Sequence, residues 1–169
     1  MIRFNMPTDQ NNAVIYNSLG VAAMLRRAWR EASYYLLASV ISNPDYWQAF
    51  FNLGNSWARL GESDAALWAY EQALRSCDDY APLFLNLGIL HCSNGKYREA
   101  LPYLEQSYRL SPQGVSQAVA IGYVWFRIGE YALAWHWYRH AYRLSPKNRR
   151  IRQSLMLVGE KILACGNRG

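Results

Sequence analysis

The chain has 169 residues, of which 51% are apolar, 15% are aromatic and 18% are charged, and its formal net charge is +6. An apolar and aromatic content this high excludes an intrinsically disordered chain, and the length is that of one globular unit. Three cysteines, odd in number and without a C-x-x-C pair, exclude a disulfide-stabilised miniprotein and favour a cytoplasmic location. We also expect no membrane-spanning helix, because no run of about 18 apolar residues occurs.

A 34-residue period organises the chain. Its most regular markers are a glycine and a later alanine: Gly20, Gly54, Gly88 and Gly122, with Ala32, Ala66, Ala100 and Ala134. Each period holds two stretches with apolar residues at helical spacing, and Gly61, Gly95 or Gly129 separates the two stretches in three periods. Arg27 takes that place in the first period, where we expect a strained or differently shaped turn. The pattern predicts pairs of antiparallel helices in which small residues allow close packing.

In chain order, the sequence predicts an extended or disordered lead over residues 1–12. Four helix pairs follow, at residues 13–46, 47–80, 81–114 and 115–148. One apolar stripe over residues 149–165 predicts a closing helix that covers the last pair, and residues 166–169 are expected to be a frayed tail. Because one pair cannot bury its apolar face alone, neighbouring pairs must stack into a right-handed solenoid.

The second period resembles the tetratricopeptide repeat (TPR). It contains Phe50-x₂-Leu53-Gly54-x₂-Trp57 and then Ala66-x₃-Tyr70, where the family signature is W-x₂-L-G-x₂-Y followed by A-x₃-F and a proline. Pro44, Pro112 and Pro146 supply that proline in the other periods, and Asp78 replaces it here. The resemblance implies an all-α superhelix of antiparallel helix pairs and a protein-interaction role, as an adaptor, scaffold or chaperone without catalysis.

The resemblance also implies a concave groove, lined by the first helix of each pair, that binds a peptide. The residues carried over to this groove are Asn17, Val21, Gln48, Phe51, Asn52, Asn55, Leu85, Asn86, Ile89, Val119, Tyr123 and Arg127. Asn52 and Asn86 hold the same position in adjacent repeats, and each amide is expected either to bind a peptide backbone or to hydrate the groove. Family members that clamp acidic C-terminal tails carry Lys or Arg at four groove positions, and none of these is basic here. The groove therefore favours a neutral, apolar segment.

No arrangement of residues predicts catalysis, a metal site or a cofactor. His136 and His140 lie four residues apart on one predicted helix but lack the glutamate of an H-E-x-x-H motif and a third ligand. Both are expected on an outward, solvated face. Cys92 has no base evident in the sequence, which favours a packing role over a nucleophile. We therefore expect no enzyme and no bound metal.

Two further surfaces are candidates for contacts. The second helix of the first pair carries apolar residues where a monomer needs polar ones: Tyr34, Tyr35, Leu37 and Ile41. They predict a homodimer interface or, alternatively, a surface covered by residues 1–12. A basic patch without any acidic residue lies between positions 131 and 159: Arg139, Arg143, Lys147, Arg149, Arg150 and Arg152. It is either a solvated helix face or a site for nucleic acid or another anionic surface, and nucleic acid is the less favoured partner of the chain.

Overall fold

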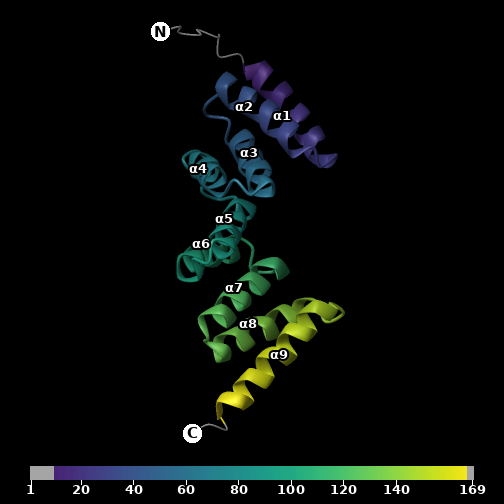
Figure 1. Ribbon diagram of the computed structural model, residues 1–169, viewed down its shortest axis with the longest axis vertical. Helices are drawn as coiled ribbons and strands as arrows, with labels where there is room; N and C mark the ends of the chain where they lie inside the picture. The colour runs from purple at the N-terminus through teal and green to yellow at the C-terminus, as the bar shows by residue number, and fades with distance from the viewer. Residues whose placement is uncertain (1–9, 167–169) are drawn as a thin grey trace. The chain divides into compact units, whose positions relative to one another are not determined.

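The computed structural model describes residues 10–166, which form nine helices and no strand (Figure 1). In chain order these are α1 (Gln10–Leu25), α2 (Trp29–Ser42), α3 (Trp47–Leu60), α4 (Ser63–Leu74), α5 (Ala81–Ser93), α6 (Tyr97–Leu110), α7 (Val115–Ile128), α8 (Tyr131–Leu144) and α9 (Arg149–Gly166). The predicted all-α fold class is confirmed. No described helix is long and apolar enough to cross a membrane.

Helix starts follow the 34-residue period along the chain, with one exception. The second helices begin at Trp29, Ser63, Tyr97 and Tyr131, and the first helices of the later pairs begin at Trp47, Ala81 and Val115. The prediction of an extended lead over residues 1–12 is wrong for its last three residues, because α1 already begins at Gln10. The rest of the predicted lead and residues 167–169 lie outside the described residues, and residue 166 of the predicted tail belongs to α9.

The turns within the pairs have the left-handed geometry that the sequence predicts. Gly61, Gly95 and Gly129 have φ values of 83°, 75° and 96°, a region that glycine enters without steric cost. Arg27 has a φ of 59° at the equivalent place, and it is the one non-glycine residue with positive φ among those described. An L-residue pays for this conformation, so the first turn is strained, as expected.

Close packing within each pair depends on the periodic glycine. A Cβ atom added to Gly20 would lie 2.6 Å from the Leu36 side chain, and one added to Gly54 would lie 2.5 Å from the Tyr70 ring. The four periodic alanines on the second helices have no exposed surface. The prediction that these small residues let paired helices approach each other is therefore confirmed.

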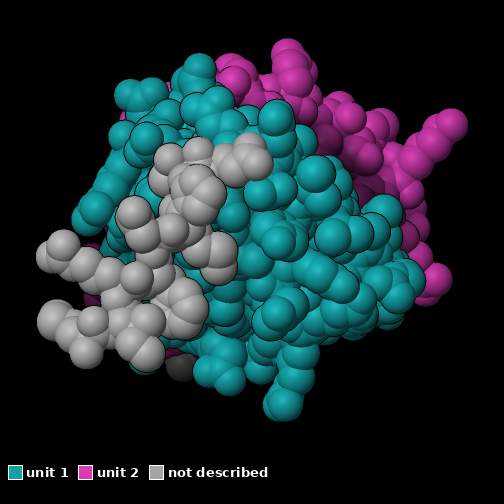
Figure 2. Space-filling view, turned by 90° about the horizontal axis from the view of Figure 1, so that it is seen from above, with its two compact units in different colours: residues 1–79 teal, residues 80–169 magenta. Residues whose placement is uncertain are grey.

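The described chain divides into two compact units rather than one: unit 1 is Met1–Asp79 and unit 2 is Tyr80–Gly169 (Figure 2). The single globular unit expected from length is thus corrected, and the reason is that a repeat contacts only its neighbours along the chain. Each unit contains two helix pairs, and the same hydrogen bond occurs within the first pair of each unit. Ser39 Oγ donates to Ala13 O in unit 1, and Ser107 Oγ donates to Ala81 O in unit 2, both at 2.7 Å.

Unit 2 has one element more, because α9 packs on its second pair. Buried Ile151 joins Ala118 and Ala141, and buried Val158 joins Ala134 and Tyr138. These contacts cover one face of α9 with apolar side chains from α7 and α8. The last pair of unit 2 is therefore closed by a helix, in the way the apolar stripe over residues 149–165 predicts.

Candidate peptide-binding surfaces

In unit 1, the side chains predicted to line a groove come from α1 and α3. Asn17, Val21, Gln48, Phe51, Asn52 and Asn55 are all half-buried there. Two of the amides are joined, since Asn52 Nδ2 donates to Asn17 Oδ1 at 2.9 Å. Asn17 Nδ2 in turn donates to Tyr46 Oη at 3.4 Å. The bond between the amides fixes the orientation of two polar groups on neighbouring first helices.

Tyr70 reaches from α4 to the same face of α3. Its hydroxyl donates to Asn55 Oδ1 at 2.8 Å, and its ring centroid lies 6.2 Å from that of Phe51. Tyr70 is buried, so this bond holds Asn55 against the core. The sequence marks Tyr70 as a packing residue, but it gives no signal for the bond that connects the residue to the candidate site.

An arginine stacked on an aromatic ring completes the face of unit 1. Arg59, near the end of α3, places its Cζ atom 5.7 Å from the ring centroid of Trp29 at the start of α2. A guanidinium over an indole face gains a cation–π attraction while its N–H groups at the edge remain able to donate. Arg59 holds the same repeat position as Arg127, which is one of the predicted groove residues.

Unit 2 repeats this arrangement with tyrosine in place of tryptophan. Arg127 of α7 lies over Tyr97 of α6, with 4.5 Å between Cζ and the ring centroid, and 5.6 Å from the ring of Tyr123. Arg127 Nη1 also donates to Tyr123 Oη at 2.6 Å. This hydrogen bond raises the pKa of Arg127 above its usual value. Of the other predicted groove residues, Leu85, Asn86 and Val119 are half-buried, and Ile89 is exposed.

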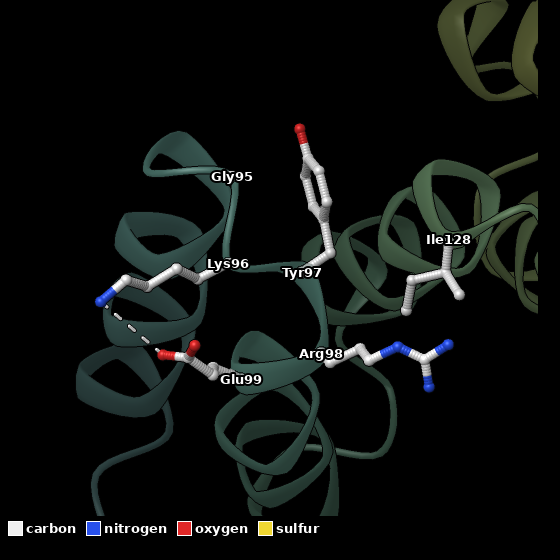
Figure 3. Close-up of a pocket in the computed structure, with 6 residues that line it drawn as sticks. All are labelled: Gly95, Lys96, Tyr97, Arg98, Glu99 and Ile128. Carbon is white, nitrogen blue, oxygen red and sulfur yellow. Dashed lines mark ion pairs between the residues drawn. The ribbon is translucent and has the colours of Figure 1, made fainter.

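A solvent-open hollow of about 380 Å³ lies next to Tyr97 (Figure 3). Its lining residues are Gly95, Lys96, Tyr97, Arg98, Glu99 and Ile128. In Figure 3, Lys96 and Glu99 point toward each other on one side, with 3.8 Å between Nζ and Oε2, and Arg98 extends on the other side near Ile128. The hollow therefore offers an aromatic ring and an aliphatic side chain with charged groups at its edge.

Two features bear on the chemistry of these surfaces, the state of the Cys92 thiol and the placement of potential metal-ligating side chains. Cys92 is half-buried on α5, and burial raises the pKa of its thiol, while the charge of Arg127 lowers it by a smaller amount. A thiol with a raised pKa is a poor nucleophile at neutral pH. The described residues contain no group of three His, Cys, Asp or Glu side chains that could hold a metal ion.

The histidines differ from one another and partly from expectation. His136 is exposed, as predicted, but His140 is half-buried, and its Nε2 lies 2.8 Å from Tyr108 Oη. The prediction for His140 is therefore wrong, because Tyr108 of the preceding pair covers it. His91, to which the sequence assigned no role, is buried and stacks on Tyr103, with 5.1 Å between ring centroids. Its Nδ1 lies 3.6 Å from Glu99 Oε2.

The first pair exposes the apolar side chains that predict self-association. Tyr34 and Ile41 of α2 are 71% and 61% exposed, and Leu37 is also exposed. Tyr35 is half-buried and packs edge-on against Tyr34, with 5.7 Å between ring centroids. On α1, Val14, Ile15, Leu19 and Leu25 are exposed as well. Of these four, Ile15 and Leu19 were not assigned to any contact surface from the sequence.

All six cations of the predicted basic patch are exposed. Among the described residues, none of the six forms an ion pair, and Arg139 instead lies over Trp135 with 5.0 Å between Cζ and the ring centroid. The patch thus presents uncompensated positive charge along the end of α8, the following turn and the start of α9.

Comparisons with known proteins agree on the fold. A family model for the tetratricopeptide repeat matches residues 17–82 and 85–149. A crystal structure of MamA has a TM-score of 0.82 at 18% identity, covering 89% of this chain and 82% of that one. YrrB, a TPR protein with an unusual peptide-binding site, has a TM-score of 0.77 at 17% identity, covering 89% of this chain and 76% of that one.

Pseudomonas aeruginosa pilF has a TM-score of 0.81 at 20% identity, covering 91% of this chain and 70% of that one. At these identities the structural likeness shows the fold alone. No curated protein sequence matches the chain. The family model, however, covers most of the chain in two blocks, and the helix pairs, glycine turns and close glycine contacts agree with it. The chain therefore belongs to the tetratricopeptide-repeat family.

Proposed function

We propose that this protein–protein interaction module binds a peptide segment of a partner protein on the faces of its first helices, α1 with α3 in unit 1 and α5 with α7 in unit 2. The observation that carries the proposal is the arginine stacked on an aromatic ring, which both units place at equivalent positions. Arg59 lies over Trp29, and Arg127 lies over Tyr97. Neither arginine is ion-paired within residues 10–166.

Each face combines the groups that an extended peptide needs. Half-buried amides such as Asn52 can donate to and accept from a peptide backbone, and each such bond contributes about 1 kcal/mol. Exposed apolar side chains such as Ile89 and Tyr123 offer contact area for apolar side chains of the segment. The aromatic ring already restrains the stacked arginine, so its N–H groups can donate to a peptide carbonyl with little further loss of conformational entropy on binding. These groups together suit a neutral, apolar segment and require no catalysis from the chain.

The role that follows is that of an adaptor, scaffold or chaperone-like protein. A peptide-binding site in the structurally similar YrrB supports this role by fold, not by sequence. The three cysteines form no disulfide in the structure, which supports a reducing compartment such as the cytoplasm.

A pull-down from cell extract tests the proposal when the parent chain is compared with an Asn52→Ala/Asn86→Ala variant. We expect the variant to lose the partner that the parent captures, by about fivefold in affinity for each lost bond. The matched control is Gln72→Ala/Gln106→Ala, which removes two amides from the second helices and should leave capture unchanged. Full retention by the first variant, or equal loss by both variants, would place the site elsewhere.

We also propose that the chain forms a homodimer through Tyr34, Tyr35, Leu37 and Ile41 of α2. Large exposed apolar side chains on one helix are the kind of surface that a second copy covers. Light scattering of the parent beside Leu37→Glu tests this, and we expect a dimer that the charged side chain dissociates. A parent that is monomeric at every concentration would refute self-association and leave peptide binding untouched.

A further inference from the structure

Helix α9 has a second, uncovered face that the closing role does not explain. One side of the helix is buried through Ile151 and Val158. On the other side Met156 and Leu163 are 63% and 70% exposed, and Leu157 is also exposed. A helix that only closes a repeat array needs a polar outer face, because its task is to solvate the end of the core. The apolar residues on this face therefore indicate a further contact.

The exposed face is not shaped to receive another repeat helix. Met156 lies 34 residues after Gly122, at the place where every preceding repeat has its close-packing glycine. Even a single Cβ at Gly54 would lie 2.5 Å from the ring of its partner helix. A methionine is far larger than the glycine at this place, so a second helix could not approach α9 as closely as the paired helices approach each other at Gly20, Gly54 and Gly88.

Positive charge lies on the same helix. Arg149, Met156 and Leu163 follow one another at intervals of seven residues, which places them along one side of α9, about 10 Å apart. Arg150 and Leu157 repeat this arrangement on the adjacent side. Glu160, the single acidic residue of α9, lies between Met156 and Leu163 on their side of the helix, and it is exposed. Unit 2 as a whole has 12 Lys and Arg residues against four Asp and Glu, a formal charge of +8.

We propose that α9 docks on an anionic lipid surface. The cations at its N-terminal end contact lipid phosphates, and Met156, Leu157 and Leu163 enter the boundary between headgroups and acyl chains, with the helix lying in the plane of the interface. The exposed carboxylate of Glu160 stays at the level of the headgroups. This proposal is independent of peptide binding, because it uses no residue of the first-helix faces α1, α3, α5 and α7.

The chemistry of the face favours lipid over the other anionic partners. The phosphates of a nucleic acid could bind the cations, but they offer no contact for the exposed aliphatic side chains. In addition, α9 has no aromatic ring on which a base could stack. The exposed apolar face of α1 in a second copy offers these cations no carboxylate, since α1 contains no charged residue. A lipid surface satisfies both the cations and the aliphatic side chains.

Vesicle co-sedimentation tests the proposal, with phosphatidylcholine vesicles that either contain or lack phosphatidylglycerol. We expect the parent chain to bind only the anionic vesicles. Arg150→Gln/Arg152→Gln should weaken binding by roughly 25-fold, about fivefold for each cation. The matched control is Arg98→Gln/Arg109→Gln, which removes the same charge from α6 of the same unit and should bind as the parent does.

A second pair of variants tests the apolar contact. Met156→Ser/Leu163→Ser should weaken binding to anionic vesicles, whereas Val14→Ser/Leu25→Ser, which changes equally exposed residues of α1, should not. Circular dichroism checks that all variants retain the helical content of the parent. The proposal is overturned if the parent binds neither vesicle or both equally, or if the control loses as much binding as Arg150→Gln/Arg152→Gln. It is also overturned if Met156→Ser/Leu163→Ser binds unchanged, or if duplex DNA binds the parent more tightly than the anionic vesicles do.

Discussion

Unit 1 and unit 2 are built alike and charged differently. Both contain two helix pairs, a buried serine that bonds the start of a first helix, and an arginine over an aromatic ring. Yet unit 1 has six Lys and Arg residues against eight Asp and Glu, a formal charge of −2, while unit 2 carries +8. The residues that the fold requires therefore recur with the repeat, whereas the charged residues differ between the two units. The net charge of the whole chain hides this difference.

The largest expected loss of stability comes from truncating equivalent buried leucines of the two units to alanine. Leu36 and Leu104 have no exposed surface and pack on the periodic glycines, so Leu36→Ala and Leu104→Ala should each cost about 2–5 kcal/mol. Hydrogen exchange should accelerate mainly in the unit that carries the change. Leu25→Ala, at an exposed leucine, is the control and should be nearly neutral. Equal acceleration in both units would show that the chain opens as one body.

Substitution of the periodic glycines should produce a smaller difference in stability between the two units. A Cβ at Gly54 would lie 2.5 Å from the Tyr70 ring, but one at Gly122 would lie 3.3 Å from Trp137 and Tyr138. Gly54→Ala should therefore destabilise the chain by about 1–3 kcal/mol in urea unfolding. Gly122→Ala should be close to neutral, because the better helix propensity of alanine offsets the tighter contact. A greater loss for Gly122→Ala would contradict the packing described for the second pair.

The buried serines test whether the units are equivalent in energy as well as in geometry. Ser39→Ala and Ser107→Ala each remove a 2.7 Å bond to a backbone carbonyl, and each should cost about 1 kcal/mol in thermal or urea unfolding. Repeats two and four already have buried alanine at this place, Ala73 and Ala141, so the backbone tolerates the change. Clearly unequal losses would show that the two hydroxyl groups have different surroundings.

The smallest effect concerns the first turn, the one that lacks glycine. Arg27 holds a φ of 59°, so Arg27→Gly should relieve strain and stabilise unit 1 by about 0.5–1 kcal/mol, net of the entropy that glycine adds to the unfolded chain. The midpoint of urea unfolding measures this gain. Arg30→Gln, a change at an exposed residue one turn later, serves as the comparison and should leave the midpoint unchanged. A loss of stability in Arg27→Gly would mean that the arginine side chain makes a contact worth more than the strain.

The sequence predicts those features that depend on a repeated local rule. The glycine turns and the contact of Gly54 with Tyr70 follow from residue type and period alone. The start of α1 at Gln10, three residues before the position that the period gives, does not follow from this rule.

Contacts between long side chains of different helices could not be predicted from the sequence either. The stacking of Arg127 on Tyr97 joins residues 30 positions apart, and His140 is covered by Tyr108 from 32 positions away. The 30-residue spacing recurs between Trp29 and Arg59, but residue type and period do not by themselves say which side chains meet. Their identity as polar or aromatic residues was visible, but which side chains meet depends on how the helices pack.

The most direct test of peptide binding is an amide NMR titration of the full chain with a peptide selected by it from a random library. We predict that the largest shift changes fall on the first helices, around Asn52 in α3 and Tyr123 in α7, with the side-chain signals of Arg59 or Arg127 moving as well. Changes confined to the second helices or to α9 would contradict the proposed site.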